Sequence, residues 1–382
     1  MFTKRAKIAL FKGIVTKRAP IYVQFSVTKN CNLKCRMCNS SVSRKREREL
    51  ALTEIKKIAD TLEKIKVGII LITGGEPFLR DDIVEIIRIF SKKGFTVRLQ
   101  TNGILATEDK IKSACEAGMK EVTISLDSLI PEVHDAITGQ KESWNKVIES
   151  ISRFSRILPC KNTILGINTL ACRQNLHELT DIIKFATKIG FYSSLIPVHT
   201  VTSLSSGEFV IRKEAPGFSF QKEDFSGIDS VYREIIRMKK NNYNIYNSYR
   251  FLRNTPQFLK GNRINWRCDS PYLYFAISPS GNFLPCVDIK TSISMLDDNF
   301  VNLYNSSAFR SRIRERVENC KGCFYACWPE ITFFCRDLLV LAERVIFGMK
   351  AALKNRTAVT YEGCLEIIKA IKAGKEDKAK IA

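Results

Sequence analysis

The hydrophobic pattern in the first half of the chain alternates between two periods. Short runs rich in β-branched and aromatic residues are typical of strands. The stretches after them, with apolar residues every three or four positions, are typical of amphipathic helices. The predicted strands cover residues 22–27, 67–72, 96–100, 122–126, 163–170 and 192–198, and the predicted helices cover residues 54–64, 82–92, 108–117, 144–157 and 176–189. This alternation predicts βαβ units with a parallel sheet, whose active site gathers at the carboxyl ends of the strands.

The alternation fades near residue 200, and residues 201–265 yield no ordered prediction. Residues 276–283 predict a hairpin that turns at Gly281. Residues 331–353 predict one long helix with an apolar stripe at 334, 338, 341, 342, 345, 346 and 349, next to basic Arg344, Lys350 and Lys354. The chain is therefore divided into a basic segment (1–20), a barrel (21–225), a C-terminal domain (226–335), and an amphipathic helix with a basic tail (336–382).

Composition limits the class of protein. The 382 residues suggest two or three domains, and 45% hydrophobic with 26% charged residues excludes a disordered or fibrous chain. The net charge of +22 indicates either anionic partners or a solvated basic face. The sequence has no signal-peptide pattern and no apolar run long enough to span a membrane. The 13 cysteines are therefore expected to be metal ligands in a reducing cytoplasm, in preference to disulfides.

Three of these cysteines, Cys31, Cys35 and Cys38, follow the first predicted strand with C-x3-C-x2-C spacing. Three thiolates can hold one corner of a 4Fe–4S cubane and leave the fourth iron open to a small molecule. A zinc knuckle with an unseen fourth ligand is the alternative, although zinc sites usually use paired C-x2-C spacings.

A second motif follows the second predicted strand, where Gly74 and Gly75 precede Glu76 and Pro77. Glycines at the end of a strand let the backbone approach a ligand closely. With the cysteine triad, this loop makes residues 20–200 resemble the radical S-adenosylmethionine (radical SAM) enzymes. Met37 stands where that family commonly has an aromatic residue.

The resemblance implies a fold and a set of cofactor contacts. The fold would be an α/β partial (β/α)6 TIM-like barrel, and the cofactors a 4Fe–4S cluster and S-adenosylmethionine. The loop at 74–77 would hold the amino group of the cofactor's methionine. The ends of the third and fourth strands would lie near its ribose, with Asn168 and Asn175 as weaker contacts. The implied cofactor-binding residues are Gly74, Gly75, Glu76, Pro77, Thr101, Asn102, Ser125, Asp127 and Asn168. Residues 131–139 are similar to a stretch that follows the fourth strand in one branch of the family.

A second group of cysteines lies in the C-terminal half. Cys268 and Cys286 flank the predicted hairpin, and Cys320 and Cys323 form a C-x2-C pair. Four thiolates suffice to close a cluster. The arrangement resembles the auxiliary domain called SPASM when it holds two clusters and twitch when it holds one. We expect one auxiliary 4Fe–4S cluster on these four cysteines, in a small hairpin-plus-helix domain. Cys327 is an alternative ligand, Cys335 could serve a second cluster, and a structural zinc ribbon is the competing interpretation.

Two other residues are weak catalytic candidates. His199 follows the sixth predicted strand and could move a proton near the substrate, although a lone loop histidine is more often only hydrogen-bonded. Asp288 follows Cys286 by two residues, whereas some SPASM enzymes place an acid directly beside that cysteine. Cys115, Cys160, Cys172 and Cys364 are expected to be buried apolar residues, and His134 to order its loop.

The predicted activity is radical SAM chemistry on a substrate that the sequence does not identify. The resemblance implies a peptide or protein side chain first, and a small alcohol next. A lipid or other membrane-associated substrate is an alternative, because basic ends flank an apolar helix that could lie on the inner face of an anionic membrane. Only about 20 residues precede the first strand, which is too few for a fused leader-binding domain, and a partner could supply one. The expected electron donor is a ferredoxin or flavodoxin. A zinc nucleic-acid-binding protein is the remote alternative, without a recognised nucleic-acid motif.

Overall fold

The computed structural model describes residues 2–38, 48–159, 162–199, 216–320, 322–353 and 356–374. Its centre is one eight-stranded sheet in the order β6-β5-β4-β3-β2-β1-β7-β8. The strands are β1 (Tyr22–Ser26), β2 (Ile69–Thr73), β3 (Thr96–Thr101), β4 (Glu121–Ser125), β5 (Ile164–Ala171), β6 (Tyr192–Pro197), β7 (Tyr274–Ile277) and β8 (Phe283–Leu284). The strands from β1 to β6 pair in parallel, which confirms the six predicted strands and the α/β class.

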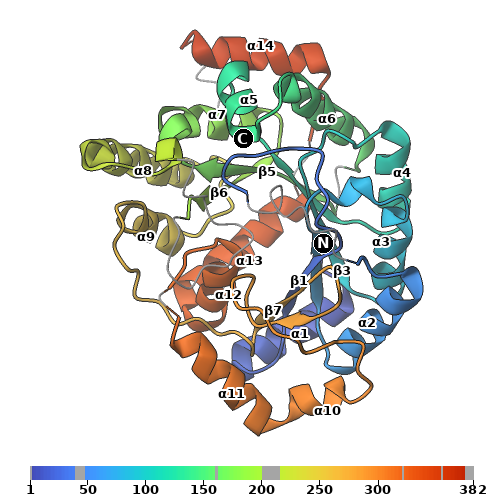
Figure 1. Ribbon diagram of the computed structural model, residues 1–382. Coiled ribbons are helices and arrows are strands. Elements are labelled where there is room, and N and C mark those ends of the chain that lie inside the picture. Colours follow the sequence, from blue (N-terminus) through green and yellow to red (C-terminus); the bar gives the residue numbers. More distant parts are fainter. Residues whose placement is uncertain are drawn as a thin grey trace.

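Five of the helices between these strands confirm the predicted βα alternation. They are α2 (Leu52–Lys64), α3 (Ile83–Lys92), α4 (Glu108–Glu116), α6 (Ser143–Ile157) and α7 (Leu179–Lys188). Figure 1 shows α2, α3, α4 and α6 outside the curved sheet. Successive strand residues point to opposite faces. Residues such as Val23, Phe25, Ile70 and Ile72 therefore join the helices in the main core, and the intervening residues point to the inside of the barrel.

The predicted hairpin forms, and its first strand also pairs with a strand of the barrel, which the sequence did not indicate. β7 pairs in parallel with β1, in a register that sets Tyr22 opposite Tyr274, and β8 then returns antiparallel. The hairpin thereby extends the barrel sheet. The segment after residue 225 also returns to the opposite edge, where Ser193 N–H donates to Asn244 O over 2.8 Å. The domain boundaries at 20, 225 and 335 remain predictions.

Several helices were not predicted. They are α1 (Lys4–Thr16), α5 (Pro131–Thr138), α8 (Phe225–Lys240), α9 (Tyr249–Leu259), α10 (Phe300–Asn305), α11 (Ser307–Glu318) and α14 (Tyr361–Lys372). Among the described residues, short 3-10 turns also lie at Pro77–Leu79, Arg173–Glu178, Pro216–Phe218 and Lys222–Asp224. The chain near the C-terminus packs back on the barrel, where α14 contacts α6 and α7 (Figure 1). This explains the complete burial of Cys364 within the main core.

The single helix predicted over residues 331–353 is wrong. The segment forms α12 (Cys327–Arg336) and α13 (Leu338–Leu353), with extended backbone at Asp337 between them. Asp337 breaks the helix because its carboxylate accepts the Leu339 N–H over 2.9 Å, the N-cap arrangement that starts a new helix. Both helices pack on the inner side of the sheet. Trp328 stacks on Tyr274, with ring centroids 4.8 Å apart, and Phe347 lies 4.5 Å from Tyr192. The two helices thus occupy the side that a six-stranded barrel leaves open.

Within the described residues, no helix is both long and apolar enough to cross a membrane.

Candidate active site

The loop that carries Cys31, Cys35 and Cys38 begins at the carboxyl end of β1 and is hydrogen-bonded to α5. Lys34 N–H donates to Thr138 O, and Arg36 N–H donates to Ile137 O, both over 3.2 Å. Cys31 Sγ accepts the Leu33 N–H over 3.4 Å and faces the Asn102 side-chain amide at 3.8 Å. Backbone and amide donors are the groups that stabilise thiolate sulfur. The loop therefore presents Cys31, Cys35 and Cys38 from an anchored backbone.

The three thiols share one electrostatic environment. Burial raises the pKa of Cys31 to about 11, and the charges of Glu76 and Cys38 add to this rise. The pKa of Cys35 is raised well above its ordinary value, first by burial and then by Cys38, Asp127 and Cys31. Deprotonated together, these thiols would repel one another unless a cationic group lay between them. A soft, positively charged iron site matches this donor set.

The glycine-rich loop after β2 packs directly against the cysteine loop. Gly75 N–H donates to Thr28 O, and Glu76 N–H donates to Asn30 O, each over 2.8 Å. A Cβ at Gly75 would lie 2.0 Å from Asn30 O, and one at Gly74 would lie 2.4 Å from Thr28 O. Both distances are far inside van der Waals contact, so this approach requires glycine at both positions. The glycines thus join the two predicted cofactor loops into one unit.

Glu76 is a positioning residue in this unit. Its fully buried carboxylate accepts the Phe78 N–H at 2.9 Å, the Thr101 hydroxyl at 2.7 Å and the Asn102 N–H at 2.8 Å. Burial raises the pKa of Glu76, and these three hydrogen bonds oppose the rise. The carboxylate therefore couples the end of β2 to the end of β3 and sets Thr101 and Asn102 beside the cysteine loop. Pro77 begins the short turn that follows.

The ends of β4 and β5 complete the rim of the barrel, which is the edge formed by the carboxyl ends of its parallel strands. Ser125 pairs in register with Asn168, whose amide donates to Thr123 Oγ1 over 3.1 Å. Buried Asp127 accepts the Leu170 N–H over 2.8 Å, and its pKa is raised to about 6 by burial. Asn175 donates to Asp127 O over 2.7 Å. The predicted cofactor residues thus meet along one rim of the barrel.

His134 orders this rim. Its Nδ1 accepts the Asp127 N–H over 3.2 Å, and burial lowers its pKa to about 4. The neutral imidazole therefore fixes the backbone at Asp127. This hydrogen bond is consistent with the loop-ordering role expected for His134 from the sequence.

The four predicted auxiliary cysteines converge from separate segments. Burial raises the pKa of Cys268, Cys286 and Cys323, and each carries a further rise from another member of the group: Cys320 acts on Cys268, Cys323 on Cys286, and Cys268 on Cys323. Tyr274 in β7 donates its hydroxyl to Cys268 Sγ over 3.3 Å, and Gly322 N–H donates to Cys320 Sγ over 3.4 Å. This set of four thiols has the composition that a 4Fe–4S cluster requires.

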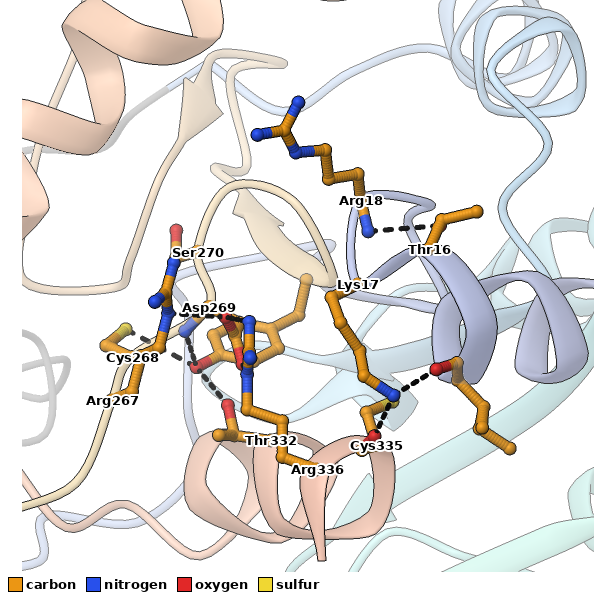
Figure 2. A network of polar contacts seen from close by, with 12 residues as sticks. Thr16, Lys17, Arg18, Arg267, Cys268, Asp269, Ser270, Thr332, Cys335 and Arg336 are labelled. Atoms are coloured by element: carbon orange, nitrogen blue, oxygen red, sulfur yellow. Dashed lines mark hydrogen bonds and ion pairs between the residues drawn. The ribbon is translucent and has the colours of Figure 1, made fainter.

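Figure 2 shows the polar network that holds the start of this region. Asp269, next to Cys268, is 1% exposed, and Arg336 grips its carboxylate with two contacts of 2.7 Å. The Lys17 ammonium donates to the backbone carbonyls of Ile14 and Cys335. The C-terminal ends of α1 and α12 are thereby fastened to the cysteine-bearing loop.

Cys327 and Cys335 belong to the same apolar cluster as Cys268, Cys286 and Cys323. Cys335 is buried beside Lys17, Asp269 and Arg336. The Cys327 thiol donates to Gln24 Oε1 at 4.0 Å, on the inner face of β1, and burial raises its pKa to about 12. Neither cysteine is among the charges that raise the pKa of Cys268, Cys286 or Cys323. The ligand set of Cys268, Cys286, Cys320 and Cys323, with Cys327 as the alternative ligand, stays a prediction.

His199 and Asp288, the weak catalytic candidates, lie beside this group. His199 is buried, its Nε2 accepts the Phe324 N–H over 3.0 Å, and its ring stacks on Tyr325 at 3.8 Å. Burial lowers its pKa to about 3. This favours a positioning role over proton transfer. Asp288 accepts the Tyr325 hydroxyl over 3.3 Å, and its charge raises the pKa of Cys286 and Cys323.

Within the described ranges, no three His, Cys, Asp or Glu side chains are arranged to hold a single metal ion. Ligands of a mononuclear ion converge on one point at about 2 Å, whereas the thiolates of a cubane each bind a different iron.

Comparison with known proteins shows which family has a domain similar to the one that carries this site. Residues 25–186 match the family described as Radical SAM superfamily. The chain contains a radical SAM domain. This match covers the cysteine loop, the glycine loop and the strand ends described above. Radical SAM proteins use a 4Fe–4S cluster and S-adenosylmethionine, and the thiol triad and glycine-rich rim fit that pair.

Curated relatives share this domain. An AdoMet-dependent heme synthase of Methanosarcina barkeri is 30% identical over 178 residues, which cover 46% of this chain and 50% of that protein. A PqqA peptide cyclase of Bradyrhizobium diazoefficiens is 32% identical over 168 residues, which cover 44% of this chain and 43% of that protein. The chain thus aligns with about half the length of these curated relatives.

The fold of the radical SAM domain and its C-terminal extension has a solved counterpart. The structure of Streptococcus suis SuiB bound to precursor peptide SuiA covers 81% of this chain and 70% of its own chain, with a TM-score of 0.60 and 15% identity. At this identity, the likeness concerns the fold alone. It agrees with a partial barrel that is followed by further helices and strands.

The sequence interpretation missed Gln24, Tyr274 and Asp269. The signal for Gln24 was a polar residue in the middle of an otherwise buried strand, Tyr22–Ser26. Nothing local marked Tyr274 or Asp269, because their roles depend on partners distant in the sequence.

Proposed function

We propose that this chain is a radical SAM enzyme with one auxiliary 4Fe–4S cluster, acting on a peptide or protein side chain. The observation that carries the proposal is the union of the thiol triad with the Gly74–Gly75 loop at the carboxyl ends of parallel strands, within a radical SAM domain. Cys31, Cys35 and Cys38 would hold a cluster that supplies one-electron reduction of S-adenosylmethionine, and the chemistry supplied would be hydrogen abstraction from a substrate C–H bond.

The residues of the chain would position these groups. Cys31, Cys35 and Cys38 would ligate the SAM cluster. Glu76 would hold Thr101 and Asn102 at the cofactor, and Asp127 would maintain the rim near its ribose. Cys268, Cys286, Cys320 and Cys323 would ligate the auxiliary cluster, with α12 and α13 excluding water from the open side of the barrel.

A peptide substrate is supported by two relatives. One is named a PqqA peptide cyclase, and another, from Mycolicibacterium smegmatis, is named mycofactocin maturase MftC, with 31% identity over 172 residues. Another relative is named a heme synthase and not a peptide cyclase, so oxidation of a small alcohol stays an alternative. A ferredoxin or flavodoxin would supply the electron.

A membrane-associated substrate is the second candidate, because two helices expose apolar side chains. Phe11 on α1 is 68% exposed and Leu338 on α13 is 81% exposed, together with Ile8, Val15, Leu339, Val345, Ile346 and Met349. Exposed Lys4, Lys7 and Lys12 lie on α1. Apolar side chains flanked by cations are typical of surfaces that rest on anionic lipid.

The test of the proposed function is release of 5′-deoxyadenosine by anaerobically reconstituted, dithionite-reduced protein. The peptide, lipid and small-polar fractions of the source cell are added in turn. We expect slow release without substrate and stimulation by the peptide fraction, with Cys31→Ala as the inactive control. Stimulation by lipid would support the second candidate instead. Absence of any release at full iron content would overturn the radical SAM assignment of activity.

A further inference from the structure

The inner face of β1 carries a polar side chain that neither proposed cofactor site uses. Val23 and Phe25 face the helices in the main core, so alternation directs Gln24 to the inside of the barrel. Gln24 is 6% exposed. Buried side-chain amides normally have hydrogen-bond partners for both their oxygen and their nitrogen.

The amide of Gln24 is only half satisfied. Its Oε1 accepts the weak Cys327 thiol contact at 4.0 Å. Its Nε2 has no hydrogen-bond partner anywhere in the described parts of the chain. Gln24 Nε2 is not among the described polar atoms that are both unpaired and sealed from solvent, so a ligand with an acceptor oxygen can reach it.

The pair lies between the two groups of cysteines. Trp328 packs on the inner side of the sheet, against Tyr274 and edge-on to Tyr22 at 5.9 Å. Cys327 directly precedes Trp328 and follows the auxiliary cysteine Cys323 by four residues. Gln24 lies two residues before Ser26, the last residue of β1, from whose end the Cys31 loop departs. A molecule at Gln24 would therefore lie inside the barrel, with the SAM rim on one side and the auxiliary group on the other.

The pair combines a thiol with a carboxamide. The Cys327 thiol has a pKa of about 12, and burial is the main cause. It is therefore a neutral donor at physiological pH. Together, Gln24 and Cys327 offer a carboxamide donor, a carboxamide acceptor and a thiol.

We propose that Gln24 and Cys327 form a substrate subsite that binds an amide group, with Gln24 Nε2 donating to its carbonyl oxygen and Gln24 Oε1 accepting its N–H. A carboxamide and a peptide amide complement each other, because each has one donor and one acceptor side. An acyl chain would leave Nε2 unpaired. The subsite rests on the proposed function and deepens it by favouring a peptide over a hydrocarbon substrate.

The test uses alkylation of Cys327 by two small probes, with and without an amide. Anaerobic holoenzyme is treated with iodoacetamide or with iodoethane, and modification of Cys327 is followed by peptide mass spectrometry. Both reagents need the thiolate, so the high pKa of Cys327 cancels in the ratio of their rates. The variants are Gln24→Leu and, as a matched control, Gln257→Leu on the exposed face of α9. Iron content confirms that each variant is folded and loaded.

We expect Cys327 to be alkylated in the holoenzyme. The iodoacetamide-to-iodoethane rate ratio should fall at least fivefold in Gln24→Leu and change less than twofold in Gln257→Leu. An unchanged ratio in Gln24→Leu, or a Cys327 that resists both reagents while the clusters are bound, would overturn the subsite. The result is independent of 5′-deoxyadenosine release. A chain that shows the amide preference without releasing 5′-deoxyadenosine would refute the proposed function and leave the subsite standing.

Discussion

His199 Nε2 accepts a hydrogen bond from the backbone N–H of Phe324 over 3.0 Å. This bond links the end of β6 to the loop that carries the auxiliary cysteine Cys323. The imidazole must be neutral to accept it, and burial lowers the pKa of His199 to about 3. The junction between the barrel and the auxiliary region therefore depends on an uncharged histidine.

We predict that this junction loses stability in acid. The folded-state pKa of His199 lies below the unfolded value of about 6.5. Its stabilising contribution is therefore complete above pH 6.5 and is lost as the pH falls from there toward 3. Between pH 7.5 and 5.5 the loss is about 1.4 kcal/mol. His199→Gln keeps an acceptor but does not titrate, so its thermal midpoint should fall less over this range than that of the wild type. Equal falls would show that His199 does not contribute.

The iron content of cysteine variants distinguishes cluster ligands from cysteines that do not bind iron. Two 4Fe–4S clusters give about eight irons per chain. We expect Cys35→Ala and Cys320→Ala each to lose about four irons, and Cys327→Ala to retain all eight. Cys35→Ala should also abolish 5′-deoxyadenosine release, because it removes a proposed ligand of the SAM cluster. Anaerobic iron and sulfide analysis measures this directly. Loss of iron in Cys327→Ala would instead make Cys327 a ligand.

Removal of the Glu76 carboxylate should weaken the cofactor rim. Glu76→Ala leaves the Phe78 and Asn102 N–H groups and the Thr101 hydroxyl buried without their acceptor. One unpaired buried group costs about 1–3 kcal/mol. We expect a rise of at least tenfold in the KM for S-adenosylmethionine, with a smaller change in kcat. Glu85→Ala, which removes only a surface pair with Arg88, is the control. Equal KM values for both variants would refute the positioning role.

The exposed apolar side chains of α1 and α13 predict vesicle binding, if the membrane candidate is correct. Wild-type protein should then co-sediment with phosphatidylglycerol vesicles at low salt and dissociate at high salt, because screening weakens the attraction of the Lys residues. Phe11→Glu with Leu338→Glu should reduce binding at least tenfold. The control is Thr357→Glu with Ala358→Glu, which adds the same charge at exposed positions outside both helices. Absence of wild-type binding would eliminate this candidate.

The sequence by itself determined the six parallel strands, five of the helices between them, the hairpin and both groups of cysteines. These features are local: a strand such as Ile69–Thr73 is marked by its β-branched run, and the triad Cys31, Cys35 and Cys38 by its spacing. The family resemblance rested on the same short motifs, and the match over residues 25–186 confirmed it.

Only the tertiary structure decided the rest, because it depends on contacts between residues far apart in the chain. The pairing of β7 with β1 brings residues about 250 positions apart into one sheet. The break at Asp337 turns one predicted helix into two that cover the open side of the barrel. The approach of Cys327 to Gln24 follows from this packing. Spacing indicates which residues can act together, but the free energy of burial and pairing selects which of them meet.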